Sequence, residues 1–211
     1  GSHLYQNPHW FQLTSVSVEG SPKYLNRTSL LDDVKPLLAG NLWHVPVKRI
    51  ERNLQEKPWV DRAVVKRQFP HVLRISIQER VPLGRWRDDG LVDAHAQVFR
   101  PESIPSFDPS LPVFFAQKDS LAEQVVKRCQ QMISRLAMTD IDVTRCGIDA
   151  RGAWMLTLAK GAEVILGVKD VDKRLVHLMS FLPKLKQDFP GGFSRIDLRY
   201  RHGFALRRSK S

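Results

Sequence analysis

The chain has 211 residues, of which 42% are hydrophobic and 9% aromatic, and its formal net charge at pH 7 is +11. This composition is sufficient for one large or two small folded domains, and it excludes a chain that is disordered throughout. No run of about 18 apolar residues occurs, so the sequence predicts no membrane-spanning helix within these residues.

The first three residues, Gly-Ser-His, are typical of the remnant of a cleaved purification tag. We expect residues 1–10 to be tag remnant and linker, and any upstream membrane anchor to be absent from this chain.

Residues 11–82 predict a small α+β domain. Apolar residues at helical spacing indicate two helices, the first with a capping box at Ser29 and shortened by Pro36, the second over 47–54 and ending before Pro58. Three stretches alternate apolar and polar residues and predict strands: 11–18, 59–69 and 71–80. A three-stranded sheet with two helices on one face would bury all these apolar stripes.

Residues 83–207 predict a second domain, a mostly antiparallel β-sheet with two helices, followed by a tail over 208–211. One helix is expected to begin at a capping box at Ser120, and the other covers about 170–188. A hairpin is expected to turn at Asp89-Gly90, and a proline-rich loop follows it. The loop leads to an apolar segment over 111–115, and the further strands are predicted in the segments 91–99, 141–150, 153–160, 162–168 and 193–207.

The two cysteines form no metal-binding cluster. Cys129 lies on the apolar face of a predicted helix, and Cys146 lies beside a glycine in a predicted strand. Free buried thiols are favoured over a single disulfide, because a small apolar side chain is common on such a face. Neither arrangement identifies the cellular compartment.

No catalytic, cofactor or metal motif is recognisable, so the sequence does not favour an enzyme. The seven histidines are scattered singly. Asp88, Asp89 and Asp93 flank a glycine, which is typical of turns rather than of paired catalytic carboxylates. The five tryptophans are interpreted as core or hairpin anchors. The charged residues of the second helix are interpreted as a solvated face rather than a docking face: Lys48, Arg49, Glu51 and Arg52.

The positive charge is concentrated in two parts of the chain. Residues 11–81 carry 12 Lys and Arg against 7 Asp and Glu, and residues 195–211 carry 6 against 1. Neither part contains a dense basic arm or a basic motif interleaved with aromatic residues. A nucleic-acid partner is therefore not predicted.

Several stretches together resemble one protein family. The stretch from Trp59-Val60 through VKRQFPHVLRISIQERVPLGRW is similar to the strand–turn–strand signature of a POTRA domain in the form found in the FtsQ/DivIB family of bacterial cell-division proteins. GLVDAHAQVF, RGAWMLTLAKGAEVILG and IDLRYRHGFAL resemble that family's β domain in the same order. The resemblance extends from Phe11 to Leu206 and is closest to the Gram-negative form.

The resemblance implies the periplasmic part of a single-pass protein of the bacterial inner membrane, with membrane contact only through an N-terminal anchor. It also implies a non-enzymatic scaffold of the divisome that recruits the coiled-coil partners FtsB and FtsL and helps to regulate septal peptidoglycan synthesis. The family's surface for FtsB corresponds here to Leu198, Arg199, Tyr200 and Gly203.

Two departures from the family pattern stand out. Ala96 occupies a hairpin turn that usually holds glycine, which puts the geometry of that turn in question. Arg207-Arg208 stand where some members have an aromatic residue, and Phe204 stands where a small residue is common.

The stretch FSRIDLRYRHGFALR, residues 193–207, predicts a hairpin with its turn at 201–203. It has two interpretations, an edge strand protected by arginines or a strand to which an acidic partner segment is added by β-augmentation. Augmentation is favoured, with Tyr200 as the anchor. The candidate partner-binding residues are Arg195, Leu198, Arg199, Tyr200, His202, Gly203, Phe204 and Leu206.

Two alternatives belong to other functional classes. A POTRA-type chaperone or secretion module would bind client polypeptides, but such proteins usually carry several POTRA units, and one is found here. Binding of anionic lipid or nucleic acid by the basic surface would show steep salt dependence.

Overall fold

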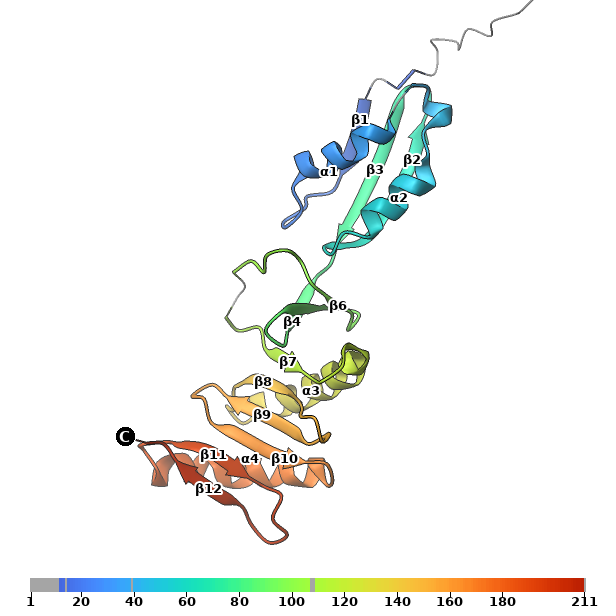
Figure 1. The fold of residues 1–211 in the computed structure, drawn as a ribbon. Helices are drawn as coiled ribbons and strands as arrows, with labels where there is room; N and C mark the ends of the chain where they lie inside the picture. Colours follow the sequence, from blue (N-terminus) through green and yellow to red (C-terminus); the bar gives the residue numbers. More distant parts are fainter. Residues whose placement is uncertain (1–11, 14, 39, 107–108, 211) are drawn as a thin grey trace, which may run out of the picture. The chain divides into compact units, whose positions relative to one another are not determined.

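The computed structural model describes four segments of the chain (Figure 1), residues 12–13, 15–38, 40–106 and 109–210. The predicted tag remnant and linker and the start of the first predicted strand at Phe11 lie outside the described residues. The chain divides into two compact units, Gly1–Val81 and Pro82–Ser211.

The first unit has the predicted β-α-α-β-β order. Its elements are β1 (Ser15–Glu19), α1 (Arg27–Val34), the 3₁₀ turns η2 (Lys35–Leu37) and η3 (Leu42–His44), α2 (Val47–Gln55), β2 (Val60–Gln68) and β3 (Val72–Glu79). The sheet order is β1-β3-β2, with β1 parallel and β2 antiparallel to β3. The predicted POTRA-type fold is confirmed.

The start of α1 differs from the prediction. The side chain of Asn26 accepts hydrogen bonds from the backbone N–H groups of Thr28 and Ser29, at 2.9 and 3.4 Å, so Asn26 is the N-cap. The predicted capping box at Ser29 is therefore wrong by one turn. Pro36 shortens the helix as predicted, because the chain continues from Val34 as the 3₁₀ turn η2.

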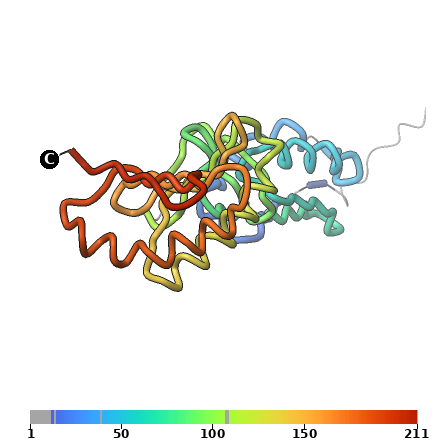
Figure 2. Tube along the Cα trace, turned by 90° about the horizontal axis from the view of Figure 1, so that it is seen from below, coloured from blue at the N-terminus to red at the C-terminus, as the bar shows by residue number. Residues whose placement is uncertain are grey.

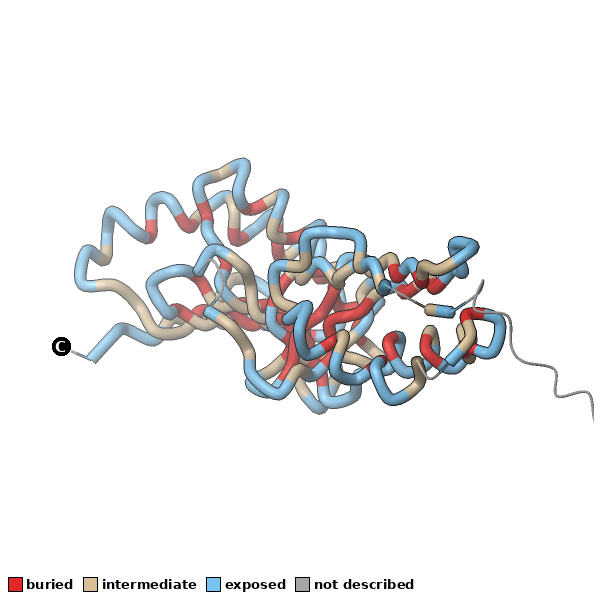
Figure 3. The backbone as a smooth tube through the Cα atoms, turned by 90° about the horizontal axis from the view of Figure 1, so that it is seen from above, coloured by how far each residue is buried: buried red, intermediate tan, exposed pale blue. Residues whose placement is uncertain are grey.

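Both helices of the first unit pack on the sheet through buried apolar residues (Figure 3). This core consists of Leu30, Val34, Leu42, Val45, Ile50, Leu54, Val60, Ala63, Val65, Leu73 and Ile75. Not every tryptophan contributes to a core. Trp59, Trp86 and Trp154 are buried, but the Trp43 side chain is 54% exposed, so its prediction as a core or hairpin anchor is wrong. Trp10 lies outside the described residues.

The second unit contains one large sheet with two long helices. Its strands are β4 (Pro82–Trp86), β5 (Gly90–Asp93), β6 (Val98–Phe99), β7 (Val113–Phe115), β8 (Val143–Ile148), β9 (Trp154–Leu158), β10 (Glu163–Gly167), β11 (Phe193–Asp197) and β12 (Ala205–Arg208). Its helices are α3 (Ala122–Ala137), preceded by η4 (Asp119–Leu121), and α4 (Val171–Asp188). The sheet order is β12-β11-β10-β9-β8-β7-β4-β5-β6. Most neighbouring strands are antiparallel, which confirms the predicted fold class.

One face of this sheet carries the core. A row of mutually registered residues crosses six strands on that face: Phe114, Cys146, Leu156, Val164, Ile196 and Leu206. The buried residues of α3 and α4 pack against this row. Figure 2 shows α4 in orange running beside the β11–β12 hairpin in red. The apolar row ends at Leu206, on the last strand of the sheet.

The cysteines form a disulfide bond, so the prediction of free thiols is wrong. Helix α3 packs over β7 and β8, and this packing brings the Cα atoms of Cys129 and Cys146 to 5.8 Å, within the range that a disulfide spans. This Cα–Cα distance could not be predicted from the sequence, because the distance depends on how the helix lies on the sheet.

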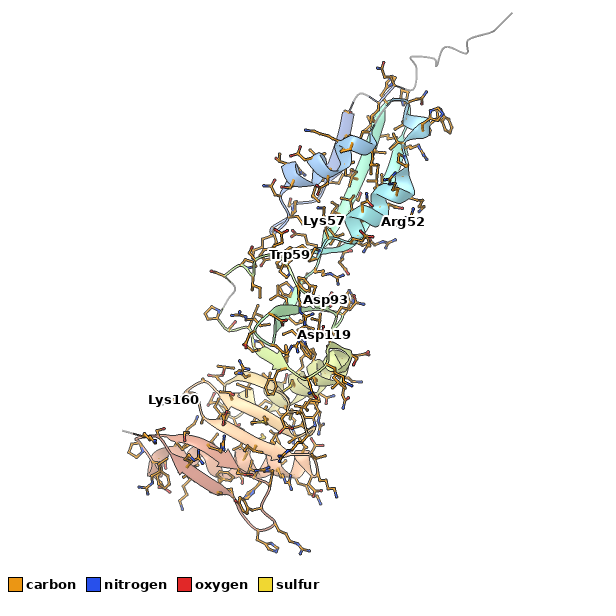
Figure 4. The ribbon with its side chains drawn as sticks, in the orientation of Figure 1. Arg52, Lys57, Trp59, Asp93, Asp119 and Lys160 are labelled. Atoms are coloured by element: carbon orange, nitrogen blue, oxygen red, sulfur yellow. A yellow bond between two sulfur atoms is a disulfide. The ribbon has the colours of Figure 1, made fainter. Side chains whose placement is uncertain are left out.

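Helix α3 does not begin at the predicted capping box, because Ser120 lies inside the 3₁₀ turn η4. The carboxylate of Asp119 instead accepts hydrogen bonds from Trp86 Nε1 at 2.8 Å and from Arg100 Nη1 at 2.7 Å. These bonds hold η4 against β4 and the end of β6 (Figure 4).

The hairpin turn at Ala96 keeps its left-handed geometry without glycine, with φ of 59°. Asp93 Oδ1 accepts hydrogen bonds from the backbone N–H groups of His95 and Gln97, each at 2.9 Å. These bonds fix the turn and explain how it tolerates alanine. They also confirm a turn role for Asp93.

Candidate partner-binding edge

Strand β12 is the end strand of the large sheet and pairs with β11 alone. Within the described residues, the other hydrogen bonds to its backbone come from Ser194 on β11, whose hydroxyl donates to the carbonyls of Arg207 and Arg208 at 3.4 Å. An end strand of an antiparallel pair directs alternate N–H and C=O groups away from its neighbour. The outer side of β12 therefore presents backbone groups to which an extended segment can bind.

Each of the other end strands is wholly or partly blocked, or very short. On the outer side of β2, Gln55 Oε1 accepts from Ala63 N–H and Glu51 Oε2 accepts from Val65 N–H, each at 3.0 Å, so α2 closes this edge. At the end of β1, the Arg27 guanidinium donates to the carbonyl of Val18 at 2.8 Å. Strand β6 has two residues. Among the described strands, β12 is thus the edge best suited to strand addition.

The hairpin loop is longer than predicted. Strand β11 ends at Asp197, whose Oδ1 accepts from the backbone N–H of Arg199 at 3.0 Å and bends the chain out of the sheet. The Arg199 guanidinium also pairs with this carboxylate, which lowers the pKa of Asp197 below its ordinary value. The loop over 198–204 includes the predicted turn, and Tyr200 lies on it with its side chain 59% exposed.

Leu198 is a core residue. Its side chain is 1% exposed, and its N–H donates to the carbonyl of Ile165 on β10 at 2.9 Å. It therefore supports the base of the loop from inside, and its side chain cannot contact a partner without leaving the core.

The arginines of the β11–β12 hairpin, of which Arg195 and Arg199 were predicted as contact residues, include ion-paired and unpaired residues. Arg195 Nη2 lies 2.8 Å from Glu163 Oε2, and Arg199 pairs with Asp197. Within the described residues, Arg201 and Arg207 have no ion pair. Because Arg207 is registered with Arg195, both lie on the sheet face opposite the core.

A basic pocket with a volume of about 550 Å³ lies between α4 and the loop. Gly167, with φ of +82°, leaves room for two of its arginine side chains, because a Cβ there would lie 2.6 Å from Arg174 Nη1 and 3.0 Å from Arg199 Cγ. The pocket is lined by Asp170, Lys173, Arg174, His177, Leu198, Arg199, Tyr200, Arg201, His202 and Gly203. It brings together predicted residues of the loop with residues of α4 that sequence reasoning missed.

An aromatic cluster joins the loop to α4. Phe204 stacks on Phe181, with ring centroids 4.0 Å apart, and His177 makes edge contacts with both rings. His177 and Phe181 were not predicted. Their spacing of four residues on α4, away from the buried stripe through Leu175, Leu178 and Leu182, is the signal that could have identified them.

Within the described residues, no group of three or more His, Cys, Asp or Glu side chains is placed to hold a metal ion. Over the same residues, no helix has the length and apolar character needed to cross a membrane.

Comparison with known proteins gives a consistent result for both units. Residues 11–80 match the family described as "POTRA domain, FtsQ-type", and residues 84–199 match "Cell division protein FtsQ/DivIB, C-terminal". The chain is 31% identical over 206 residues to the cell division protein FtsQ of Allochromatium vinosum, covering 97% of this chain and 81% of the relative. It is 32% identical over 193 residues to FtsQ of Thioalkalivibrio, covering 91% and 79%. It is 27% identical over 203 residues to FtsQ of Neisseria meningitidis serogroup B, covering 96% and 85%.

Proposed function

This chain belongs to the FtsQ/DivIB family of cell division proteins, and we propose that it is a non-enzymatic scaffold of the divisome that recruits its partners by strand addition at β12. The observation that carries the mechanism is the end position of β12, whose outer side is not covered by another described segment. Main-chain hydrogen bonds to such an edge supply affinity, and alternate side chains supply selectivity.

The two faces of β12 define the chemistry of the partner segment. Leu206 ends the apolar row on the core face, whereas Arg207 lies on the opposite face in register with Arg195. An added strand would place alternate side chains beside these two surfaces. The partner segment is therefore extended, with apolar residues alternating with acidic ones.

FtsB, acting with FtsL, is the proposed partner, following the family resemblance. Tyr200 is the proposed anchor, because it is an exposed aromatic residue with a polar tip beside the edge. Leu198 supports the loop from the core. The other proposed contact residues are Arg195, Arg199, His202, Gly203, Phe204 and Leu206.

We further propose that the chain lies in the periplasm, attached to the inner membrane by an N-terminal anchor. The Cys129–Cys146 disulfide supports an oxidising compartment, because reducing compartments keep most thiols unpaired. Residues 11–82 and 83–207 are proposed as the two functional domains.

The decisive experiment measures binding of the periplasmic segment of FtsB to this chain by calorimetry, together with amide hydrogen exchange. Tyr200→Ala is expected to lower the binding free energy by about 2 kcal/mol or more, while near-UV circular dichroism stays unchanged. Binding is expected to slow exchange at residues 205–208 but not on β2, whose edge α2 already covers.

Trp43→Ala is the matched control, since it removes another exposed aromatic residue from the other unit. Full affinity of the Tyr200 variant would remove Tyr200 from the interface. Unchanged exchange at 205–208 in the complex would exclude strand addition. Equal binding of unrelated extended peptides would favour a chaperone or secretion module instead.

A further inference from the structure

Two large aromatic side chains are exposed together on the first unit. Trp43 on η3 is 54% exposed and Phe69 in the β2–β3 turn is 46% exposed, and their ring centroids lie 4.6 Å apart. Two large aromatic side chains that are exposed side by side form an apolar patch, and such patches mark interaction sites on protein surfaces. We refer to these two residues as the aromatic tip.

The chain enters the unit beside the aromatic tip. Gln12 forms a β-bridge with Asn41, and the Gln12 carbonyl lies 3.0 Å from His71 Nδ1. Asn41 directly precedes η3, and His71 lies in the same turn as Phe69. Figure 1 draws η3 and the β2–β3 turn at the end of the unit where the described chain begins.

The charged groups at this end are mainly cationic. Glu51 is the acidic residue of the elements around the aromatic tip, and its carboxylate pairs with Lys48 Nζ at 2.8 Å. The Arg67 guanidinium donates to the carbonyls of Leu42 and Val45, which fixes it beneath η3. The ionisable residues on the surrounding segments 42–51 and 66–71 are His44, Lys48, Arg49, Glu51, Lys66, Arg67 and His71.

We propose that this end of the first unit binds the surface of a bilayer that contains anionic phospholipid, with the aromatic tip inserted at the boundary between headgroups and acyl chains. Tryptophan and phenylalanine beside Lys and Arg match that boundary, where apolar rings meet anionic phosphates. The proposal rests on the proposed N-terminal membrane anchor, since an anchor upstream of Gln12 would hold this end close to the bilayer.

The position of the aromatic tip distinguishes this surface from a protein-binding edge. The backbone edge of β2 beside it is closed by Glu51 and Gln55, so strand addition is not available there. Among the described residues, this end exposes aromatic rings and cations, which suits a fluid interface without a fixed complementary shape.

The experiment is co-sedimentation of this 211-residue chain with vesicles of phosphatidylethanolamine and phosphatidylglycerol, compared with phosphatidylcholine vesicles. The chain is expected to bind the anionic vesicles more tightly. The double variant Trp43→Ala, Phe69→Ala is expected to lower partitioning into the vesicles by about tenfold or more, because it removes both rings that would insert into the surface of the bilayer. Trp43→Ala alone provides the same test if the double variant does not fold.

Charge variants on one helix give a matched comparison. Arg49→Glu in the first turn of α2 is expected to weaken binding to anionic vesicles by about fivefold or more, since each basic residue near the surface contributes. Arg52→Glu in the last turn makes the same charge change farther from the aromatic tip and is expected to have less effect. Equal losses would show attraction by overall charge, and the proposal would then be wrong.

Two outcomes would overturn the proposal outright: failure of the chain to bind anionic vesicles, or unchanged binding by the aromatic variants. Insertion is checked separately with brominated acyl chains, which should quench tryptophan fluorescence in the natural sequence and much less in Trp43→Phe. Affinity for the FtsB segment should be unchanged in all these variants. Loss of vesicle binding and loss of strand addition can thus be told apart.

Discussion

The Phe204 ring stacks on the Phe181 ring with centroids 4.0 Å apart and planes inclined by 5°. This contact connects the loop after β11 to α4 at the residue directly before β12. It therefore fixes the position from which the proposed binding edge begins, before any partner is present. Preorganisation of this kind lowers the entropic cost of binding, because the loop is already ordered.

We expect Phe204→Ala and Phe181→Ala each to weaken binding of the FtsB segment, although Phe181 does not lie on the edge strand. A double-mutant cycle on the unfolding free energy should give a coupling of about 1 kcal/mol, as for other stacked aromatic pairs. The measurement is urea unfolding of the two single variants and the double variant. Additive effects would show that the stacking contributes nothing to the fold.

The outer edge of β2 provides a test in the first unit. Glu51→Ala removes the acceptor of the Val65 N–H and is expected to lower the unfolding free energy by about 1–3 kcal/mol. Glu51→Gln keeps an acceptor and should lose less. Arg52→Ala on the exposed side of the same helix is the control. A Glu51→Ala variant as stable as this control would show that the Val65 N–H donates to water instead.

Much of the fold could be predicted because it depends on local pattern. Alternation and helical spacing identified both helices and all three strands of the first unit, and the resemblance gave the family of both units. The start of α1 was missed because Asn26 and Ser29 are both good N-caps, and only the geometry selects Asn26.

The candidate site was only partly predictable, because its shape comes from contacts distant in sequence. The pattern through Ile196, Leu198 and Tyr200 continues the strand, but the Asp197–Arg199 contact ends it. The residues that α4 adds to the pocket and to the aromatic cluster could not be predicted, because their position depends on how that helix lies beside the loop. Whether these residues bind a partner stays a prediction.

The disulfide predicts a stability difference between oxidised and reduced protein. It closes a sequence separation of 17 residues between α3 and β8, and removing it by Cys129→Ala with Cys146→Ala is expected to cost about 3 kcal/mol. Thermal unfolding with and without reductant measures this. Reductant should not change the thermal unfolding of the double variant. If reductant also leaves the unfolding of the unsubstituted chain unchanged, the disulfide does not stabilise the fold.

The network around Asp119 predicts acid sensitivity of the second unit. Hydrogen bonds from Arg100, followed by that from Trp86, lower the pKa of Asp119 from 3.8 to about 2. Between these values the unfolded chain binds more protons than the folded one, so stability falls as the pH falls through this window. The contribution is present at neutral pH and lost near pH 2.

Asp119→Asn tests this contribution with a side chain of the same shape. Because the Asp119 side chain is 43% exposed, solvent screening limits the expected loss at neutral pH to about 1 kcal/mol or less. Urea unfolding of both proteins should show this difference at about pH 5 and a shrinking difference as the pH approaches about 2. A difference that stays constant over this range would contradict the prediction. It would mean that the variant loses packing rather than charge, because the Asp119 carboxyl would then have the same pKa in the folded and unfolded chain.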